Sequence, residues 1–130
     1  MTYICNIVDY SQLGYMYQTN NNLVGIYFKD KSTIYKFVDQ VEFHYVYRQK
    51  KISKKYNFNE QKDFPSEIKM KLSALQSYEK YLSEQKQDNL ININKPNYNG
   101  VIYIKKIIAT DISFILKLSN NNIEVIMFSF

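Results

Sequence analysis

The two residue types that most often carry chemistry each occur once in this chain, as Cys5 and His44. One cysteine excludes a disulfide framework and a cysteine-based metal site within one chain, and it indicates a reducing compartment. A Cys-His or Ser-His-Asp site would have to use His44, which lies between Phe43 and Tyr45 in an alternating pattern typical of a strand. The sequence also has no Gly-rich nucleotide loop and no kinase catalytic motif. We therefore predict no catalytic residue, no metal and no cofactor, and no enzymatic activity for the chain itself.

Positive charge is the other candidate for chemistry. The net charge is +5, and its densest run comprises Arg48, Lys50, Lys51, Lys54 and Lys55. Because strand patterns flank this run, it indicates the solvated end of a hairpin; a contact with an acidic partner, an anionic surface or nucleic acid is the alternative. No nucleic-acid-binding signature accompanies it, so no nucleic acid is expected. No secretory signal and no membrane-spanning run is present, so we expect the cytoplasm and nucleus and no membrane partner.

Any binding residues must be positioned by β-structure, because one strand–turn–strand pattern occurs twice. Leu23–Phe28 follows a polar turn at Asn20–Asn22. One hundred positions later, Ile123–Phe128 follows Asn120–Asn122 in the same way. Asparagine tolerates the left-handed backbone of tight turns, so each pattern predicts a β-hairpin. The long offset indicates two copies of one module, the second of them shorter.

The first copy predicts an α+β fold in which a six-stranded antiparallel sheet has one helix packed across it. The expected strands are Ile4–Tyr10, Gly14–Thr19, Leu23–Lys29, Thr33–Val38, Val41–Arg48 and Ile52–Phe58. A helix is expected at Ser66–Glu84, with Asp63 or Ser66 as its cap and Pro65 in its first turn. Its apolar residues recur at helical spacing and predict one buried stripe: Ile68, Leu72, Leu75, Tyr78 and Leu82.

A polar, Asn-rich stretch separates the two copies. We expect residues 1–85 to form the complete module, 86–100 a linker, and 101–130 the first three strands of a truncated second module. The expected strands there are Val101–Thr110, Ile112–Ser119 and Ile123–Phe130. Three strands with one apolar face are near the limit of independent stability. They should therefore pack on the first sheet or complete a sheet with a second copy.

The order and spacing of several segments resemble the polo-box domain of polo-like serine/threonine kinases. The segments that carry the resemblance to the first polo box are Val8–Ser11, Leu13–Tyr15, Val24–Asp30, Ser32–Thr33, Phe64–Ser66, Lys71–Leu72, Leu75 and Tyr81–Glu84. Tyr103–Phe128 resembles the start of the second box.

The resemblance implies a protein-interaction module that binds phosphopeptides in a cleft between two boxes. It also implies a parent serine/threonine kinase that acts in the cell cycle and mitosis. Such a module directs the kinase to the centrosome, basal body, kinetochore or spindle. The implied partner is a phosphorylated or scaffold protein.

The resemblance also implies the position of a peptide site. On this chain the implied peptide-binding residues are Ile7, Val8, Asp9, Tyr10, Tyr78, Tyr81, Lys86 and Gln87. The family places a tryptophan where Ile7 stands, and a hydrophobic pair where Lys86 and Gln87 stand. Its phosphate clamp, a histidine and a lysine, would follow Phe130, so this chain contains no clamp. Helix-on-sheet packing is the alternative role for the tyrosines.

A second function stays open from the sequence. The chain could be a dimerising polo-box scaffold of centriole or basal-body assembly that does not read phosphate. We expect a homodimer to form through Ile112–Phe130, with Ile115, Val125 and Met127 in the contact.

Overall fold

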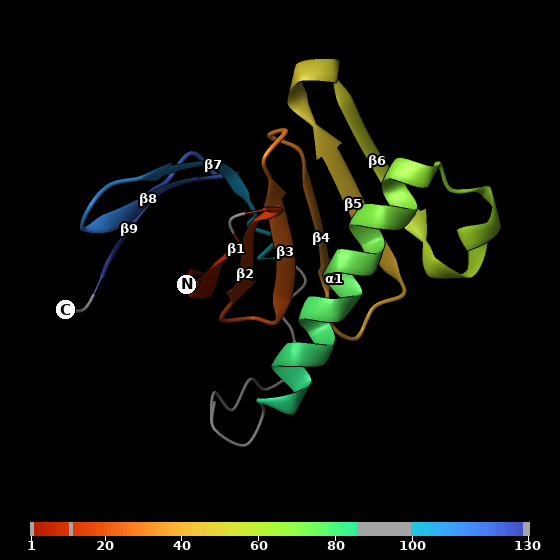
Figure 1. The fold of residues 1–130 in the computed structure, drawn as a ribbon, viewed down its shortest axis with the longest axis horizontal. Coiled ribbons are helices and arrows are strands. Elements are labelled where there is room, and N and C mark those ends of the chain that lie inside the picture. Colours follow the sequence, from red (N-terminus) through yellow and green to blue (C-terminus); the bar gives the residue numbers. More distant parts are fainter. Residues whose placement is uncertain (1, 11, 86–99, 129–130) are drawn as a thin grey trace.

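The computed structural model describes residues 2–10, 12–85 and 100–128, which form two antiparallel sheets and one long helix (Figure 1). Each strand of the six-stranded sheet pairs with the next in the chain, in the order β1 to β6. Its strands are β1 Ile4–Tyr10, β2 Gly14–Thr19, β3 Leu23–Phe28, β4 Thr33–Phe37, β5 Glu42–Tyr47 and β6 Ile52–Asn57. Two short 3-10 helices, Arg48–Lys50 and Phe58–Asp63, lie on either side of β6. The predicted α+β fold class is confirmed.

The helix α1, Ser66–Glu84, begins and ends where its apolar spacing predicts. The helix lies over one face of the six-stranded sheet (Figure 1). Its apolar stripe faces the sheet, with Leu72 and Leu75 buried among residues such as Ile26 and Phe43. The predicted caps are wrong: Pro65 occupies the N-cap position, and no side chain caps the helix. Pro65 still has an extended backbone, and its carbonyl accepts the N–H of Lys69 at 3.0 Å, which starts the helical hydrogen bonding without a capping side chain.

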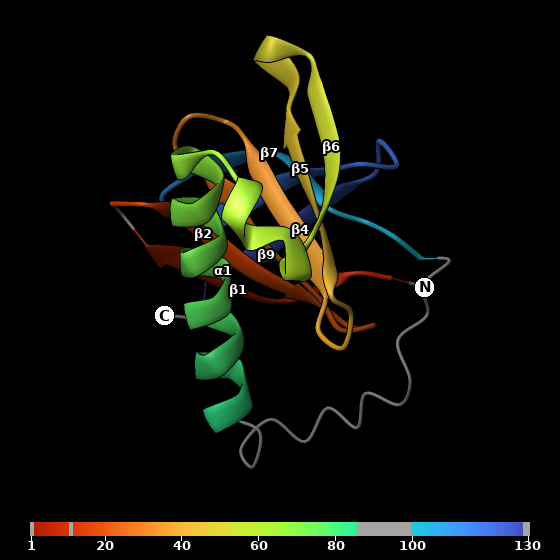
Figure 2. The same ribbon diagram turned by 90° about the vertical axis from the view of Figure 1, so that its right-hand side faces the viewer.

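The second sheet contains β7 Ile104–Ala109, β8 Ser113–Leu118 and β9 Ile123–Met127. It lies on the face of the six-stranded sheet opposite α1, as both Figure 1 and Figure 2 show. Of the two arrangements expected for these strands, packing on the first sheet is therefore the one observed. Of the predicted linker at 86–100, residues 86–99 lie outside the described residues.

The two copies of the strand pattern are related by two offsets. The φ angle is 66° at Asn22 and 67° at Asn121, so the left-handed turn residues are 99 positions apart. In the first strands, a register shift occurs between Ile4 and Asn6 and again between Ile104 and Lys106, which is an offset of 100. The predicted offset of 100 is thus right for β7 but wrong by one for β8 and β9. A one-residue slip exchanges the two faces of a strand, so this correction decides which side chains point outward.

The two sheets meet around the buried ring of Tyr17. Its hydroxyl accepts a hydrogen bond from the backbone N–H of Ile104 at 3.2 Å and contacts the Thr33 hydroxyl at 3.3 Å. Gly25 lies directly opposite Tyr17 in the neighbouring strand. A Cβ atom at residue 25 would lie 2.4 Å from Cζ of Tyr17, so only glycine leaves room for the ring.

We expect Gly25→Ala to lower the free energy of unfolding by about 1–3 kcal/mol, because the added methyl overpacks a fully buried ring. Urea denaturation followed by circular dichroism measures the change. Adding Tyr17→Leu to this variant removes the clashing ring atoms, so the two substitutions together should cost less than the sum of their separate effects. Strict additivity would contradict the contact.

We expect Leu72→Ala to cost about 2–5 kcal/mol, because its side chain is fully enclosed between α1 and the sheet. Met70 lies on the exposed face of the same helix, so Met70→Ala is the matched control and should change stability little. The same urea titration reports both. Equal losses for the two variants would mean that the stripe does not hold the helix on the sheet.

Candidate functional site

A groove runs between the edge of the six-stranded sheet and the second half of α1. Its cavity of about 380 Å³ is lined by Val8, Tyr10, Met16, Ser77, Tyr78 and Tyr81. Strand β1 is the outermost strand of the sheet on this side. Four of the six lining residues are among the predicted peptide-binding residues: Val8, Tyr10, Tyr78 and Tyr81. The structure therefore brings half of the predicted set together in one apolar groove.

The tyrosines of the groove have different environments. Tyr78 is buried, and its hydroxyl donates a hydrogen bond to Oδ1 of Asn6 at 3.3 Å. Its burial raises the pKa of the phenol above the usual value, so the group stays neutral. Tyr81 stacks on Tyr78, with ring centroids 6.4 Å apart, and is largely exposed, as is Tyr10. Tyr78 therefore supports the groove wall, and the other two rings are available to a ligand.

The other predicted peptide-binding residues do not line this groove. Ile7 points to the opposite face of β1 and packs with the residues that hold the second sheet. Asp9, two positions further along the strand, is exposed. Alternation along a strand separates Ile7 and Asp9 from Val8 and Tyr10. Lys86 and Gln87 lie outside the described residues.

The predicted dimer residues lie on the second sheet. Val125 and Met127 are exposed, and Ile115 is half-buried. Ile115 and Val125 are cross-strand neighbours on β8 and β9, and Val125 and Met127 point to the same side of β9. The three residues therefore form one patch, and self-association through it stays a prediction.

Lys71 is a polar feature that the sequence reasoning missed. Its buried ammonium donates hydrogen bonds to Asp30 at 2.7 Å, Ser32 at 2.7 Å, Glu67 at 3.1 Å and Tyr45 at 3.2 Å. Burial alone would lower the pKa of Lys71, but these hydrogen bonds outweigh it and raise the pKa. The only sequence signal is the four-residue spacing from Glu67. With its donors used inside the fold, this lysine anchors the helix and is not a free cation for a ligand.

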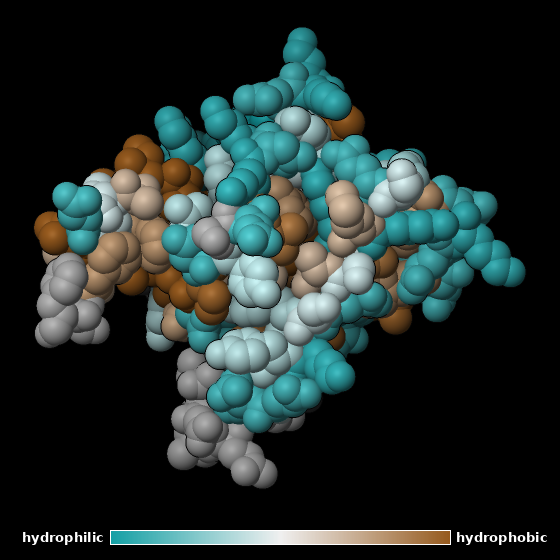
Figure 3. Space-filling model, in the orientation of Figure 1, coloured by the Kyte–Doolittle hydropathy of each residue, from teal (hydrophilic) through white to brown (hydrophobic). Residues whose placement is uncertain are grey.

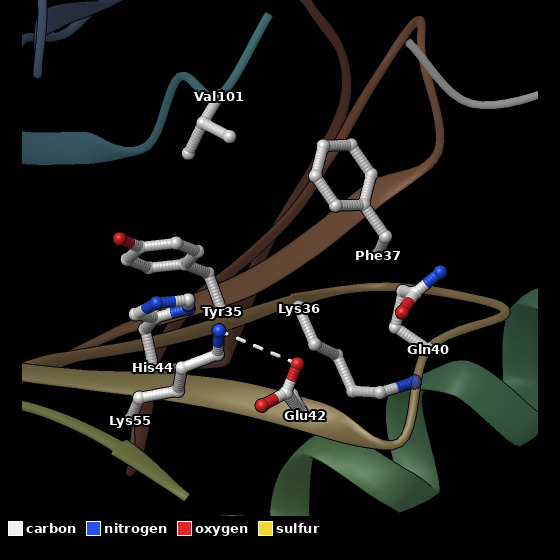
Figure 4. A pocket seen from close by; sticks show the side chains of 8 residues that line it. All are labelled: Tyr35, Lys36, Phe37, Gln40, Glu42, His44, Lys55 and Val101. Atoms are coloured by element: carbon white, nitrogen blue, oxygen red, sulfur yellow. Dashed lines mark ion pairs between the residues drawn. The ribbon is translucent and has the colours of Figure 1, made fainter. Parts of the chain in front are cut away.

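His44 lies in a second pocket, which has a cavity of about 280 Å³ (Figure 4). Its ring stacks on Tyr35 with centroids 5.1 Å apart, and Tyr35 in turn stacks on Tyr103 at 4.6 Å. Lys55 and Glu42 form an ion pair of 3.3 Å beside it. Burial, and then the charge of Lys55, lower the pKa of His44. The neutral imidazole therefore contributes to a stack that joins the two sheets.

Cys5, the other candidate for catalytic chemistry, does not have the environment of a nucleophile. Burial, and to a lesser degree Glu124, raise the pKa of the Cys5 thiol, whereas a nucleophilic cysteine needs a lowered pKa. Within the described ranges, no group of three or more potential ligand side chains could hold a metal ion. None of the described helices has the length and apolar character needed to cross a bilayer.

The lowered pKa of His44 predicts a pH dependence of stability. As the pH falls below about 6.5, the unfolded chain binds a proton before the folded chain does, so stability decreases. His44 is the only histidine, so His44→Gln should flatten the curve of unfolding free energy between about pH 7 and pH 5.5. Urea denaturation at several pH values measures the slope. An unchanged slope in the variant would show that the pKa of His44 is the same in the folded and the unfolded chain, which would contradict the prediction.

Comparisons with known proteins find a polo-box family model, a kinase and solved polo-box domains. The family model described as the POLO box duplicated region matches residues 11–72. A probable serine/threonine-protein kinase, CCRP1 of Zea mays, is 29% identical over 126 residues, which is 91% of this chain and 19% of that protein. The chain therefore spans a small part of this relative.

Solved structures show the same fold. The budding yeast Cdc5 polo-box domain in complex with a Spc72 phosphopeptide matches with a TM-score of 0.72 and 19% identity, over 98% of this chain and 48% of that chain. The complex of the same domain with the Dbf4 polo-interacting region matches with a TM-score of 0.75 and 17% identity, over 98% of this chain and 48% of that chain. The Cdc5 polo-box domain without a named partner matches with a TM-score of 0.71 and 18% identity, over 97% of this chain and 51% of that chain. The chain spans about half the length of these domains.

The matched residues run from just before β2 into α1, so they include β2 to β6 and the first part of α1, with Met16 as their one lining residue of the groove. The family match and the fold thus point to the same part of the molecule. Residues 11–72 of this chain match the polo-box family model, and the described residues share the fold of solved polo-box domains.

Proposed function

We propose that this chain is a protein-interaction module that binds an extended peptide along β1 and α1. The observation that carries the proposal is the apolar groove beside an edge strand. An edge strand offers backbone hydrogen-bonding groups to a peptide, and an adjacent apolar pocket accepts one of its side chains. The Cdc5 polo-box domains, which share this fold, bind a Spc72 phosphopeptide and a Dbf4 region. These complexes support a partner of the same kind here.

The proposed context is the C-terminal regulatory region of a polo-like serine/threonine kinase. The match to the probable kinase CCRP1, of which this chain covers 19%, supports a parent kinase. In that context the module directs the kinase to cell-cycle substrates and to the centrosome, basal body, kinetochore or spindle. The proposed kinase domain would carry out catalysis, and this chain would direct it to its targets.

The groove should bind its peptide with little dependence on phosphate. The described residues that line it include no lysine, arginine or histidine, and a phosphate group needs fixed cationic donors. We expect a Ser-pSer or Ser-pThr peptide and its unphosphorylated form to bind with similar, weak affinity. Fluorescence anisotropy with both peptides measures the ratio. Strong phosphate dependence would mean that lysines on another surface hold the phosphate. Lys50→Glu would then test whether the basic run near Lys50 is that surface.

The groove itself is tested by Tyr81→Ala, which should weaken peptide binding about tenfold because aromatic anchors dominate such contacts. Tyr3 is the matched control, since it is exposed to the same degree, 49% against 48%, and does not line the groove. Tyr3→Ala should leave the affinity unchanged. Equal effects of the two substitutions would place the peptide elsewhere.

A dimerising scaffold is the second candidate function, and the apolar residues exposed on β9 favour it. In that case two copies would join through Ile115, Val125 and Met127, and phosphate would have no part. Analytical ultracentrifugation separates the two candidates. A peptide-binding monomer supports the first, and a dimer that is lost on Val125→Asp supports the second.

A further inference from the structure

Strand β6 is the outermost strand of the six-stranded sheet on the side opposite β1 (Figure 1). Its six residues pair with β5 in one unbroken register, without the shift that interrupts β1. Edge strands are commonly protected from further pairing by a bulge, a proline or a covering element. β6 contains no proline and no bulge, and among the described elements its main contacts are with β5 and with the 3-10 helices at its two ends.

The hydrogen bonding between β5 and β6 shows which backbone groups of β6 face outward. The N–H of Phe58 donates to the carbonyl of Val41 at 2.9 Å, and this pair continues the β5–β6 register by one residue. In an antiparallel ladder, hydrogen-bonded pairs alternate with pairs that are not bonded to each other. Counting back from Phe58, Ser53 and Lys55 fall in pairs of the second kind. Their N–H and C=O groups therefore point out of the edge of the sheet.

The lysines of β6 leave these backbone groups accessible. A lysine that protects an edge extends over it, whereas both lysines here lie back along the sheet. The ammonium of Lys54 is 5.0 Å from the ring centroid of Tyr56, on the face that α1 covers. The ammonium of Lys55 forms an ion pair of 3.3 Å with Glu42 on the opposite face. Both side chains of this pair are about half exposed, so Lys55 can exchange Glu42 for another carboxylate at little cost.

The charge around the edge favours an acidic occupant. Three further cations, Arg48, Lys50 and Lys51, lie at the tip of the same hairpin, where Figure 3 shows hydrophilic side chains gathered at the top of the molecule. Opposite charges directly across two strands stabilise their pairing, and like charges destabilise it. A second copy of this chain paired through β6 would bring the same lysines against Lys54 and Lys55. The edge thus disfavours self-pairing and favours a strand that carries carboxylates.

We propose that β6 binds an extended, acidic segment of a partner protein, which adds to the sheet as one more strand. The backbone of this segment pairs with Ser53 and Lys55. Successive side chains of a strand point to opposite faces, so two adjacent carboxylates meet Lys55 on one face and Lys54 on the other. This edge lies across the whole sheet from the groove beside β1, so the proposal is independent of the peptide proposed for that groove.

The charge contact is tested with two peptides of about eight residues that share a valine- and threonine-rich sequence, which favours an extended chain. One peptide has two adjacent glutamates at its centre, and the other has two lysines there. Fluorescence anisotropy with the intact chain should show the glutamate peptide binding about tenfold more tightly. The double variant Lys54→Glu/Lys55→Glu should reverse this order.

The matched control is Lys69→Glu/Lys80→Glu, which changes the net charge equally at two exposed positions of α1. It should leave the order of the two peptides as it is. Circular dichroism verifies that both double variants are folded, as expected for four exposed positions. If the two variants change the order alike, the preference reflects net charge alone and the proposal is wrong.

The backbone pairing is tested without changing the chain. Methyl groups on the amide nitrogens of the glutamate peptide keep its carboxylates but remove its donors, so binding should fall about tenfold or more. With the unmethylated peptide, hydrogen exchange followed by NMR should slow at the amides of Ser53 and Lys55. The amides of Ile52 and Lys54 already bond to β5 and serve as the internal control. Binding that survives methylation, or protection that appears at β1 instead of β6, would overturn the proposal.

Discussion

The arrangement of the two sheets depends on the enclosure of one tyrosine ring. Tyr17 lies over Gly25, and its hydroxyl receives the N–H of the first residue of β7. Burial raises the pKa of this phenol to about 12, so it is a neutral hydrogen-bonding group at neutral pH. An unpaired N–H at this buried position would cost about 1–3 kcal/mol. The side chain, the glycine and the start of the second sheet therefore have to be considered as one unit.

The helix is held on the other face by both apolar and polar contacts. The apolar stripe supplies the larger burial, while two lysines fix its position along the sheet. Lys71 reaches Asp30 and Ser32 in the β3–β4 turn, and Lys36 of β4 forms an ion pair of 3.0 Å with Glu79. Because hydrogen bonds to charged groups are directional, they define a register that interchangeable apolar contacts leave open. The groove beside β1 depends on this register, since three of its lining residues lie on α1.

Much of the fold could be predicted from the sequence, because period and turn chemistry are local. The helix bounds at Ser66 and Glu84 followed from spacing, and the left-handed turns followed from asparagine. What failed was non-local. The sequence does not show that Ile7 faces the second sheet while Val8 faces the groove, because a strand between two covered faces carries apolar residues on both sides. The buried role of Lys71 was equally hidden, since its partners in the β3–β4 turn are some forty positions away.

The register shift near the start of β1 recurs at the same place in β7. A hydrophobic pattern alone does not require such an irregularity, yet both copies retain it although their side chains have diverged. The two copies therefore share a backbone path that tolerates different side chains. The same tolerance is seen between this chain and solved domains, which are 17–19% identical and superimpose with TM-scores of 0.71–0.75. The positions of bulges and turns thus relate the two halves more clearly than matching residues do.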